Sequence, residues 1–82
     1  MKEIKKFIKT ISLVLSHGGK VQVTQIETDD DGVLKVKLKA SARKAPFIVG
    51  RNGQNVRALE ELATVLARKS GKKRVTIQVL RG

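Results

Sequence analysis

The sequence predicts an α+β domain in which the helices pack on one face of a three-stranded mixed sheet, in the order αββααβ. Three observations support this prediction. Apolar residues recur at helical spacing over residues 2–16 and again from Gln54 onward, and they alternate with polar residues over 34–40 and 75–79. The two helices expected between these strands favour parallel pairing through a right-handed crossover. A chain of 82 residues has room for one small core, so residues 1–82 are expected to form a single domain.

The first helix and the first strand follow from two patterns. Residues 2–16 are predicted to form an amphipathic helix with lysines on its polar face, and Gly18–Gly19 ends it. The apolar face is predicted to contain Ile4, Phe7, Ile8, Ile11, Val14 and Leu15. Residues 20–28 are rich in β-branched residues and predict a strand. Its alternation slips between Val23 and Ile26, as expected for a β-bulge or for a frayed strand end.

A hairpin and two helices precede the last strand. Asp29–Gly32 has the composition of a turn, and the strand over 34–40 alternates strictly between lysines and apolar residues, so that one of its faces is buried. Pro46 fits the first turn of a short helix. The longest helix is expected to begin at Gln54 and to end at Ser70–Gly71. Its apolar face is predicted to contain Val56, Leu59, Leu62, Ala63, Leu66 and Ala67.

The net charge of +11 predicts a polyanionic partner, either nucleic acid or an anionic membrane. Residues 43–82 hold ten Lys or Arg, all six arginines among them, against two acidic residues, and so carry +8 of this charge. Guanidinium groups suit bidentate contact with phosphate, so the anion-binding surface is expected in this half. Only Phe7 and Phe47 are aromatic, which leaves no stacking platform of the kind that RRM and OB-fold proteins use.

The most informative segment is Gly50–Gly53. Two glycines three positions apart let the backbone turn sharply and approach a ligand closely. The helix that begins at Gln54 points free amides and the positive end of its dipole toward the same place. Arg51 adds a cation and Asn52 a neutral donor, without any acidic residue in the loop. The pattern predicts a phosphate-binding loop, and the alternative is an ordinary turn between two helices.

The segment Ile48–Val56 resembles the (V/I)IGxxGxxI motif of the KH family of RNA-binding domains, with Val56 in place of the final Ile. The likeness covers the whole chain, because the order of elements resembles the type II KH arrangement, with an extra helix and strand ahead of the core. The chain is similar to the small bacterial RNA-binding proteins that consist of a single KH domain (KhpA-like). Type II domains also occur within transcription elongation factors, ribosomal protein subunits and GTPases.

The resemblance implies a set of RNA-binding residues, since the GXXG loop of such folds clamps about four backbone nucleotides. The residues implied for this clamp are Gly50, Arg51, Asn52 and Gly53, and Gln54 beside them is also expected to bind RNA. Three or four unstacked bases would lie in an aliphatic groove between the helix that begins at Gln54 and the edge of the hairpin. The residues implied to floor or support this groove are Ile48, Val49, Val56 and Leu38, with Arg57 and Lys39 at its flanks.

The resemblance also implies a role and a location. We expect a cytoplasmic protein that binds single-stranded RNA without catalysis, in post-transcriptional regulation or as an RNA chaperone. One such domain contacts few nucleotides, so pairing with a second copy or with another RNA-binding protein is expected to raise its affinity.

No catalytic, metal or cofactor site is predicted. His17 has no carboxylate or second histidine at ligand spacing. Asp29–Asp31 lacks the alternating spacing of a calcium loop, so these residues are expected to cap the turn. Glu60 and Glu61 follow Arg57 at the spacing of surface ion pairs. No apolar stretch is long enough to span a membrane, and no secretory leader is expected.

Two other functions stay open. A module of the same fold could dock a protein partner through its apolar groove or its helices, and charge alone could bind DNA. Arg51 distinguishes these two functions from RNA binding at the loop. A pure scaffold has no need for a basic residue between the two glycines, and DNA binding by charge alone would depend on summed charge rather than on that loop. Attachment of the helix over residues 2–16 to a membrane surface is not expected, because its apolar face is needed to cover the sheet.

Overall fold

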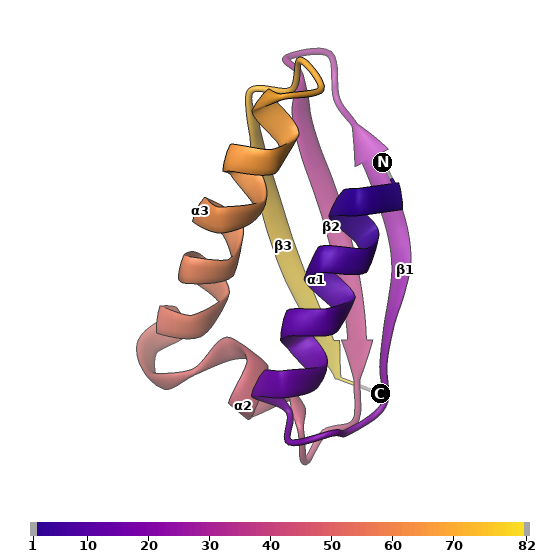
Figure 1. The fold of residues 1–82 in the computed structure, drawn as a ribbon. Helices are drawn as coiled ribbons and strands as arrows, with labels where there is room; N and C mark the ends of the chain where they lie inside the picture. Colours follow the sequence, from indigo (N-terminus) through magenta and orange to yellow (C-terminus); the bar gives the residue numbers. More distant parts are fainter. Residues whose placement is uncertain (1, 82) are drawn as a thin grey trace.

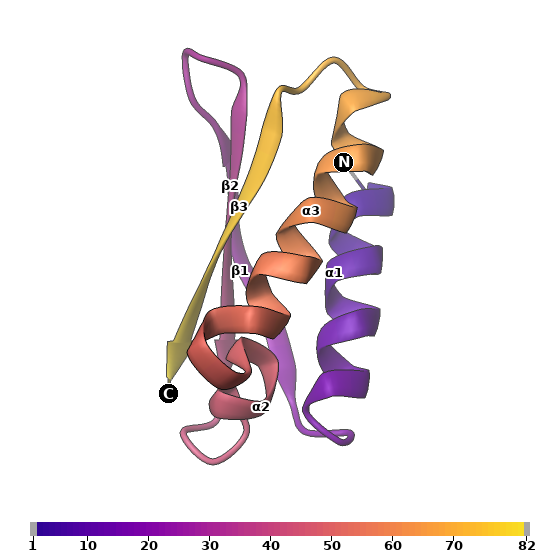
Figure 2. The same cartoon turned by 90° about the vertical axis from the view of Figure 1, so that its left-hand side faces the viewer.

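The computed structural model describes residues 2–81 and confirms the predicted α+β order. Its elements are α1 (Lys2–Leu15), β1 (Val21–Thr28), β2 (Val33–Ala40), α2 (Ala45–Val49), the 3₁₀ turn η1 (Arg51–Gly53), α3 (Gln54–Arg68) and β3 (Arg74–Arg81). The sheet has the order β1-β2-β3, with β1 antiparallel and β3 parallel to the central strand β2 (Figure 1). All helices lie on one face of this mixed sheet, which leaves the other face open (Figure 2).

The slip in the alternation of β1 is a β-bulge. The register with β2 shifts between Val23 and Gln25, so Thr24 is the extra residue. Its Oγ1 hydroxyl donates to the Lys37 carbonyl at 3.3 Å, which anchors the bulge to β2. Because of the extra residue, Val23 and Ile26 both lie opposite inward-facing residues of β2. The bulge is therefore the correct one of the two explanations that the sequence left open.

The core lies between the sheet and the helices. The strict alternation predicted for β2 is confirmed, because Leu34, Val36, Leu38 and Ala40 are each at most 3% exposed. From the helices, Ile8, Ile48 and Leu59 contribute the largest buried side chains. Burial of each such aliphatic side chain contributes about 1.5–3 kcal/mol. The loop that follows α2 is therefore attached to a rigid support.

The helical faces are rotated slightly from the predicted ones. Val14 and Leu62, both predicted on apolar faces, are 69% and 55% exposed. On α1 the buried stripe instead continues from Ile8 to Ser12 and Ser16, which are fully buried. Four-residue spacing keeps these side chains on one line, and α1 lies beside α3 (Figure 1). The prediction of the buried face of α1 failed at Val14 because a pattern of apolar residues cannot identify a serine that is buried.

The hairpin turn is capped by one carboxylate, as predicted for this acidic segment. Asp29 Oδ1 accepts hydrogen bonds from the amides of Asp31 (2.9 Å) and Val33 (3.0 Å). The Val33 amide above all, then the Asp31 amide and the nearby Lys35 ammonium, hold the pKa of this carboxyl below its ordinary value. The Lys35 Nζ lies 3.8 Å from Asp29 Oδ2. Asp29 therefore fixes the reversal between β1 and β2.

Within residues 2–81, every helix is too short or too polar to cross a membrane.

Candidate nucleic-acid interface

The Gly50–Gly53 loop has a backbone that requires glycine at its first position. Gly50 adopts φ 77° and ψ 176°, a combination that is almost confined to glycine. A Cβ atom added there would lie 2.6 Å from Asn55 Cγ and 2.8 Å from the Asn55 backbone nitrogen. Asn55 is itself held in place, because its Nδ2 donates to the Phe47 carbonyl at 2.9 Å. The loop is thus fastened to α2 and to the first turn of α3.

The second glycine has a looser role. Gly53 is left-handed, with φ 73°, but a Cβ there would meet only Val56 Cγ1, at an ordinary 4.0 Å. Between the glycines, Asn52 is also left-handed (φ 54°), a conformation that asparagine tolerates better than most residues. The Arg57 guanidinium donates to the Asn52 carbonyl at 2.9 Å and fixes the turn from α3.

The tip of the loop presents hydrogen-bond donors and positive charge to solvent. Arg51 and Asn52 are both exposed. The amide of Gly53 donates to the Gly50 carbonyl, whereas the amides of Arg51 and Asn52 have no partner among residues 2–81. Successive free amides next to a cation form an anion-binding concavity. The loop therefore offers free amides and a cation of the kind that suit an anion.

An aromatic contact places α2 against the end of α1. The ring of His17 meets the ring of Phe47 edge-on, with centroids 5.0 Å apart. The Lys44 ammonium lies 5.8 Å from the centroid of the same ring. His17 is left-handed, with φ 56°, at the end of α1. These contacts give His17 and Phe47 a structural role in holding the short helix that leads into the loop.

The structure separates the other residues predicted for the site into three groups. Ile48 and Leu38 are 0% exposed, so they lie within the core and do not line a groove. Val49 and Val56 are half-buried on either side of the loop. Gln54 is exposed at the first position of α3. Ile48, Val49, Val56 and Gln54 therefore adjoin the Gly50–Gly53 loop, whereas Leu38 belongs to the core beneath the helices.

Lys39 and the predicted edge of the groove are placed differently. Lys39 lies on the open face of the sheet, because its neighbours Leu38 and Ala40 point into the core. The strand beside α3 is β3, whereas the hairpin strands β1 and β2 lie farther away (Figures 1 and 2). The prediction that Lys39 and the hairpin edge bound the groove was wrong. Sequence order suggested that pairing, but the parallel crossover puts the last strand at the edge.

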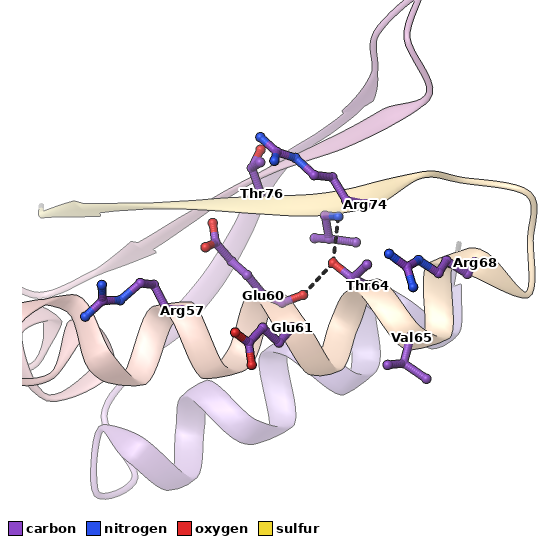
Figure 3. A pocket seen from close by; sticks show the side chains of 9 residues that line it. Arg57, Glu60, Glu61, Thr64, Val65, Arg68, Arg74 and Thr76 are labelled. Carbon is purple, nitrogen blue, oxygen red and sulfur yellow. Dashed lines mark hydrogen bonds between the residues drawn. The ribbon is translucent and has the colours of Figure 1, made fainter.

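A groove does lie between α3 and β3, with a volume of about 490 Å³ (Figure 3). We call it the α3–β3 groove, and it is lined by Arg57, Glu60, Glu61, Thr64, Val65, Arg68, Arg74, Val75 and Thr76. Three guanidinium groups and two carboxylates make it polar, in contrast to the aliphatic groove that the sequence suggested. Apart from Arg57, these residues were not assigned to the site from the sequence. Polar residues at helical spacing from 57 to 68 were the available signal.

Side chains of α3 bind the free edge of β3. The Thr64 hydroxyl accepts a hydrogen bond from the Val75 amide at 3.0 Å and donates to the Glu60 carbonyl at 2.7 Å (Figure 3). Glu60 Oε2 accepts a hydrogen bond from the Ile77 amide at 2.6 Å. Neither Glu60 nor Glu61 forms the surface ion pair with Arg57 that their spacing predicted, within residues 3–81. The carboxylate of Glu60 instead satisfies an edge amide that would otherwise be unpaired.

Comparison of the chain with protein-family models gives no match, and no curated protein matches it. The ligand of the loop therefore has to be inferred from its geometry and its charge.

Proposed function

We propose that this chain is a KH-like domain of type II that binds single-stranded RNA without catalysis. Phosphates of the RNA lie on the Gly50–Gly53 loop, and neighbouring bases extend toward the α3–β3 groove. The protein acts in the cytoplasm, in post-transcriptional regulation or as an RNA chaperone. No metal or cofactor takes part in this proposal.

The exposed tip of the loop carries the proposal. The packing of Gly50 on Asn55 explains why a glycine stands at that position, but it does not explain an exposed cation and two free amides at the tip. Arg51 and Asn52 supply donors that suit a phosphodiester. The net charge of +11 adds long-range attraction for any polyanion.

The α3–β3 groove is suited to bases rather than to phosphates alone. Arg57 joins the groove to the loop, because it lines the one and donates to the other. Glu60 and Glu61 repel phosphate but accept hydrogen bonds from base amino groups. A strand whose backbone lies on the loop would turn its bases toward these carboxylates.

An exposed apolar surface supports the second expected partner, another copy of the chain or another RNA-binding protein. We call it the α1–α3 apolar face. It comprises the exposed Val14 and Leu62 and the half-buried Phe7, Ile11 and Leu66. Between its two helices lies a depression of about 370 Å³, which Phe7, Ile11 and Leu66 line together with Glu3, Lys6 and Thr10. Exposed apolar side chains that gather on one face are typical of docking sites. The same face would serve a protein-interaction module, which is the second candidate function.

Sedimentation at high protein concentration tests this docking surface. We expect the native chain to dimerise and the variant Val14→Lys with Leu62→Lys to be monomeric, since both side chains are exposed and their replacement leaves the core intact. A monomeric native chain would exclude self-association. Retention of the dimer by the variant would place the interface elsewhere.

The function itself is tested with a loop variant, Arg51→Asp with Asn52→Asp, which removes three units of positive charge. Asp tolerates the left-handed backbone of Asn52, so this variant should fold. The matched control is an α1 variant, Lys5→Gln with Lys6→Gln and Lys9→Gln, which removes the same charge from an exposed helix face. Binding of short single-stranded RNA, with DNA and duplex controls, is measured at low and physiological salt.

We expect the loop variant to lose at least tenfold more affinity for single-stranded RNA than the α1 variant does. Both variants lose the same net charge, so the excess reports on the tip itself, as lost contacts together with repulsion of phosphate by the two new carboxylates. Equal losses would show that summed charge, and not the loop, binds the polyanion. Equal affinity for duplex DNA would favour charge-driven DNA binding. Absence of binding by the native protein at physiological salt would favour the protein-interaction module.

A further inference from the structure

The open face of the sheet carries a row of lysines along its central strand. Lys35, Lys37 and Lys39 alternate with buried residues of β2, so all three point away from the helices. Lysines on a sheet are usually explained as protection of an edge strand against unwanted pairing. That explanation fails here, because β2 is paired with β1 on one side and with β3 on the other.

Two of these lysines lack a neutralising neighbour. Lys35 forms an ion pair with Asp29, and its cross-strand neighbour is Glu27. Neither Lys37 nor Lys39 forms a salt bridge within residues 3–81. Their cross-strand neighbours are uncharged, namely Gln25 and Gln78 beside Lys37, and Gln22 and Leu80 beside Lys39. Alternate residues of a strand are about 6.7 Å apart, so the lysines form a regular line of positive charge.

This line leads into a shallow depression at the end of the hairpin. The depression has a volume of about 260 Å³ and is lined by Lys20, Gln22, Lys39, Ala40 and Ser41. Its polar side chains are two ammonium groups, an amide and a hydroxyl, and none of them is acidic. Ammonium, amide and hydroxyl donors are the groups that commonly contact the nucleic acid backbone. The open face therefore has the charge and the donors for phosphate at a place that the loop does not use.

We propose that the open face of the sheet, from Lys37 through Lys39 to Lys20, is a second surface for RNA phosphates. This inference rests on the proposed binding of single-stranded RNA at the Gly50–Gly53 loop. The sheet lies between this surface and the helices that bear the loop (Figure 2), so both can be occupied at once. One chain then holds two RNA segments, which belong either to one continuing strand or to two strands. Holding two strands together would promote their annealing.

Three variants, each without three units of positive charge, separate this surface from the loop. The sheet-face variant carries Lys20→Gln, Lys37→Gln and Lys39→Gln. The loop variant and the α1 variant are those described above. The first measurement is the affinity for a tetranucleotide RNA, which reports on the loop. The second is the affinity for a longer single-stranded RNA, measured while an unlabelled tetranucleotide saturates the loop, as a function of salt.

For the tetranucleotide, we expect the sheet-face and α1 variants to bind alike. For the longer RNA, each phosphate contact contributes about 0.7 to the slope of log affinity against log salt, so the slope of the sheet-face variant should be lower by about 2. Between about 50 and 200 mM salt, the native protein and the α1 variant should lose roughly 20-fold more affinity than the sheet-face variant.

Fluorescence energy transfer between two RNA strands that carry different labels shows whether the second bound segment belongs to the same strand or to a second one. Transfer that requires the sheet-face lysines indicates two strands. Tighter binding of the longer RNA without transfer indicates one strand that continues around the molecule. Equal slopes and affinities for the sheet-face and α1 variants would overturn the second surface. Undiminished binding of the tetranucleotide by the loop variant would instead overturn the proposed function of the loop.

Discussion

The two glycines of the loop are predicted to differ sharply in how much stability depends on them. Gly50→Ala places a methyl group 2.6 Å from Asn55 Cγ and 2.8 Å from the Asn55 nitrogen. The Asn55 side chain can rotate away, but its backbone nitrogen belongs to α3 and cannot. Gly53→Ala brings only an ordinary contact with Val56 at 4.0 Å. The second variant therefore isolates the backbone cost from the steric cost.

The magnitudes follow from these two environments. At Gly50 the glycine-only backbone region costs about 1–3 kcal/mol, and overpacking against Asn55 adds about 1–3 kcal/mol. Displacement of the Asn55 side chain also loses its hydrogen bond to Phe47, at about 1 kcal/mol. These contributions add to about 3–7 kcal/mol, and rotation of the Asn55 side chain relieves part of the overpacking, so we expect a loss of about 4 kcal/mol for Gly50→Ala. At Gly53 only the left-handed backbone is penalised, at about 1 kcal/mol.

Urea unfolding followed by circular dichroism measures the difference. With a slope near about 1 kcal/mol per molar urea for a small domain, a gap of about 3 kcal/mol separates the two midpoints by about 3 M. Small domains are stable by only about 5 kcal/mol, so Gly50→Ala should be close to unfolding at room temperature. Midpoints within about 0.5 M of each other would refute the argument. Such a result would mean that the contact between residue 50 and Asn55 can relax with little loss in the free energy of unfolding.

Two further predictions concern the hairpin turn and the edge of the sheet. The pKa of Asp29 is depressed in the folded state, so its contribution is present above the ordinary value of 3.8 and is lost as the pH falls through the folded value. Asp29→Asn should therefore flatten the acid dependence of unfolding below about pH 4, while Asp30→Asn, whose side chain accepts no hydrogen bond within residues 3–81, should keep the native dependence. Glu60→Ala leaves the Ile77 amide unpaired and should cost about 1.5–3 kcal/mol with faster exchange of that amide, against under about 0.5 kcal/mol for exposed Glu61→Ala. Equal costs for the two glutamates would contradict the edge hydrogen bond.

The sheet was predictable from sequence wherever one face of a strand is buried. The alternation in β2 is strict, and a shift of one residue would expose every apolar side chain, so pattern and structure agree there. The buried faces of the helices were harder to predict. The polar Ser12 is buried and the apolar Val14 is exposed, which is the opposite of what their polarity suggests. The elements packed against α1, namely α3, β1 and α2, decide that rotation, and the sequence of one helix carries no information on its neighbours.

The site was predictable where it is local and not where it depends on topology. The Gly50–Gly53 loop lies within one stretch of sequence, so its turn followed from residue types alone. The face on which Lys39 lies, and the strand that borders α3, depend on which strand pairs with which. Glu60 was assigned to an ion pair because local spacing offered Arg57, whereas its actual partner is the Ile77 amide, far along the chain.

The first glycine of the motif is the least suitable position at which to test its function. Gly50 is required by a contact within the chain, so its replacement damages the fold whether or not RNA binds. The backbone of Asn52 is held by Arg57, while the side chains of Arg51 and Asn52 form no hydrogen bond within residues 3–81. A change at these two positions leaves the loop built and alters only what it presents to solvent. Loss of RNA binding there, in a protein as stable as the native one, can be attributed to the lost contacts and not to a damaged fold.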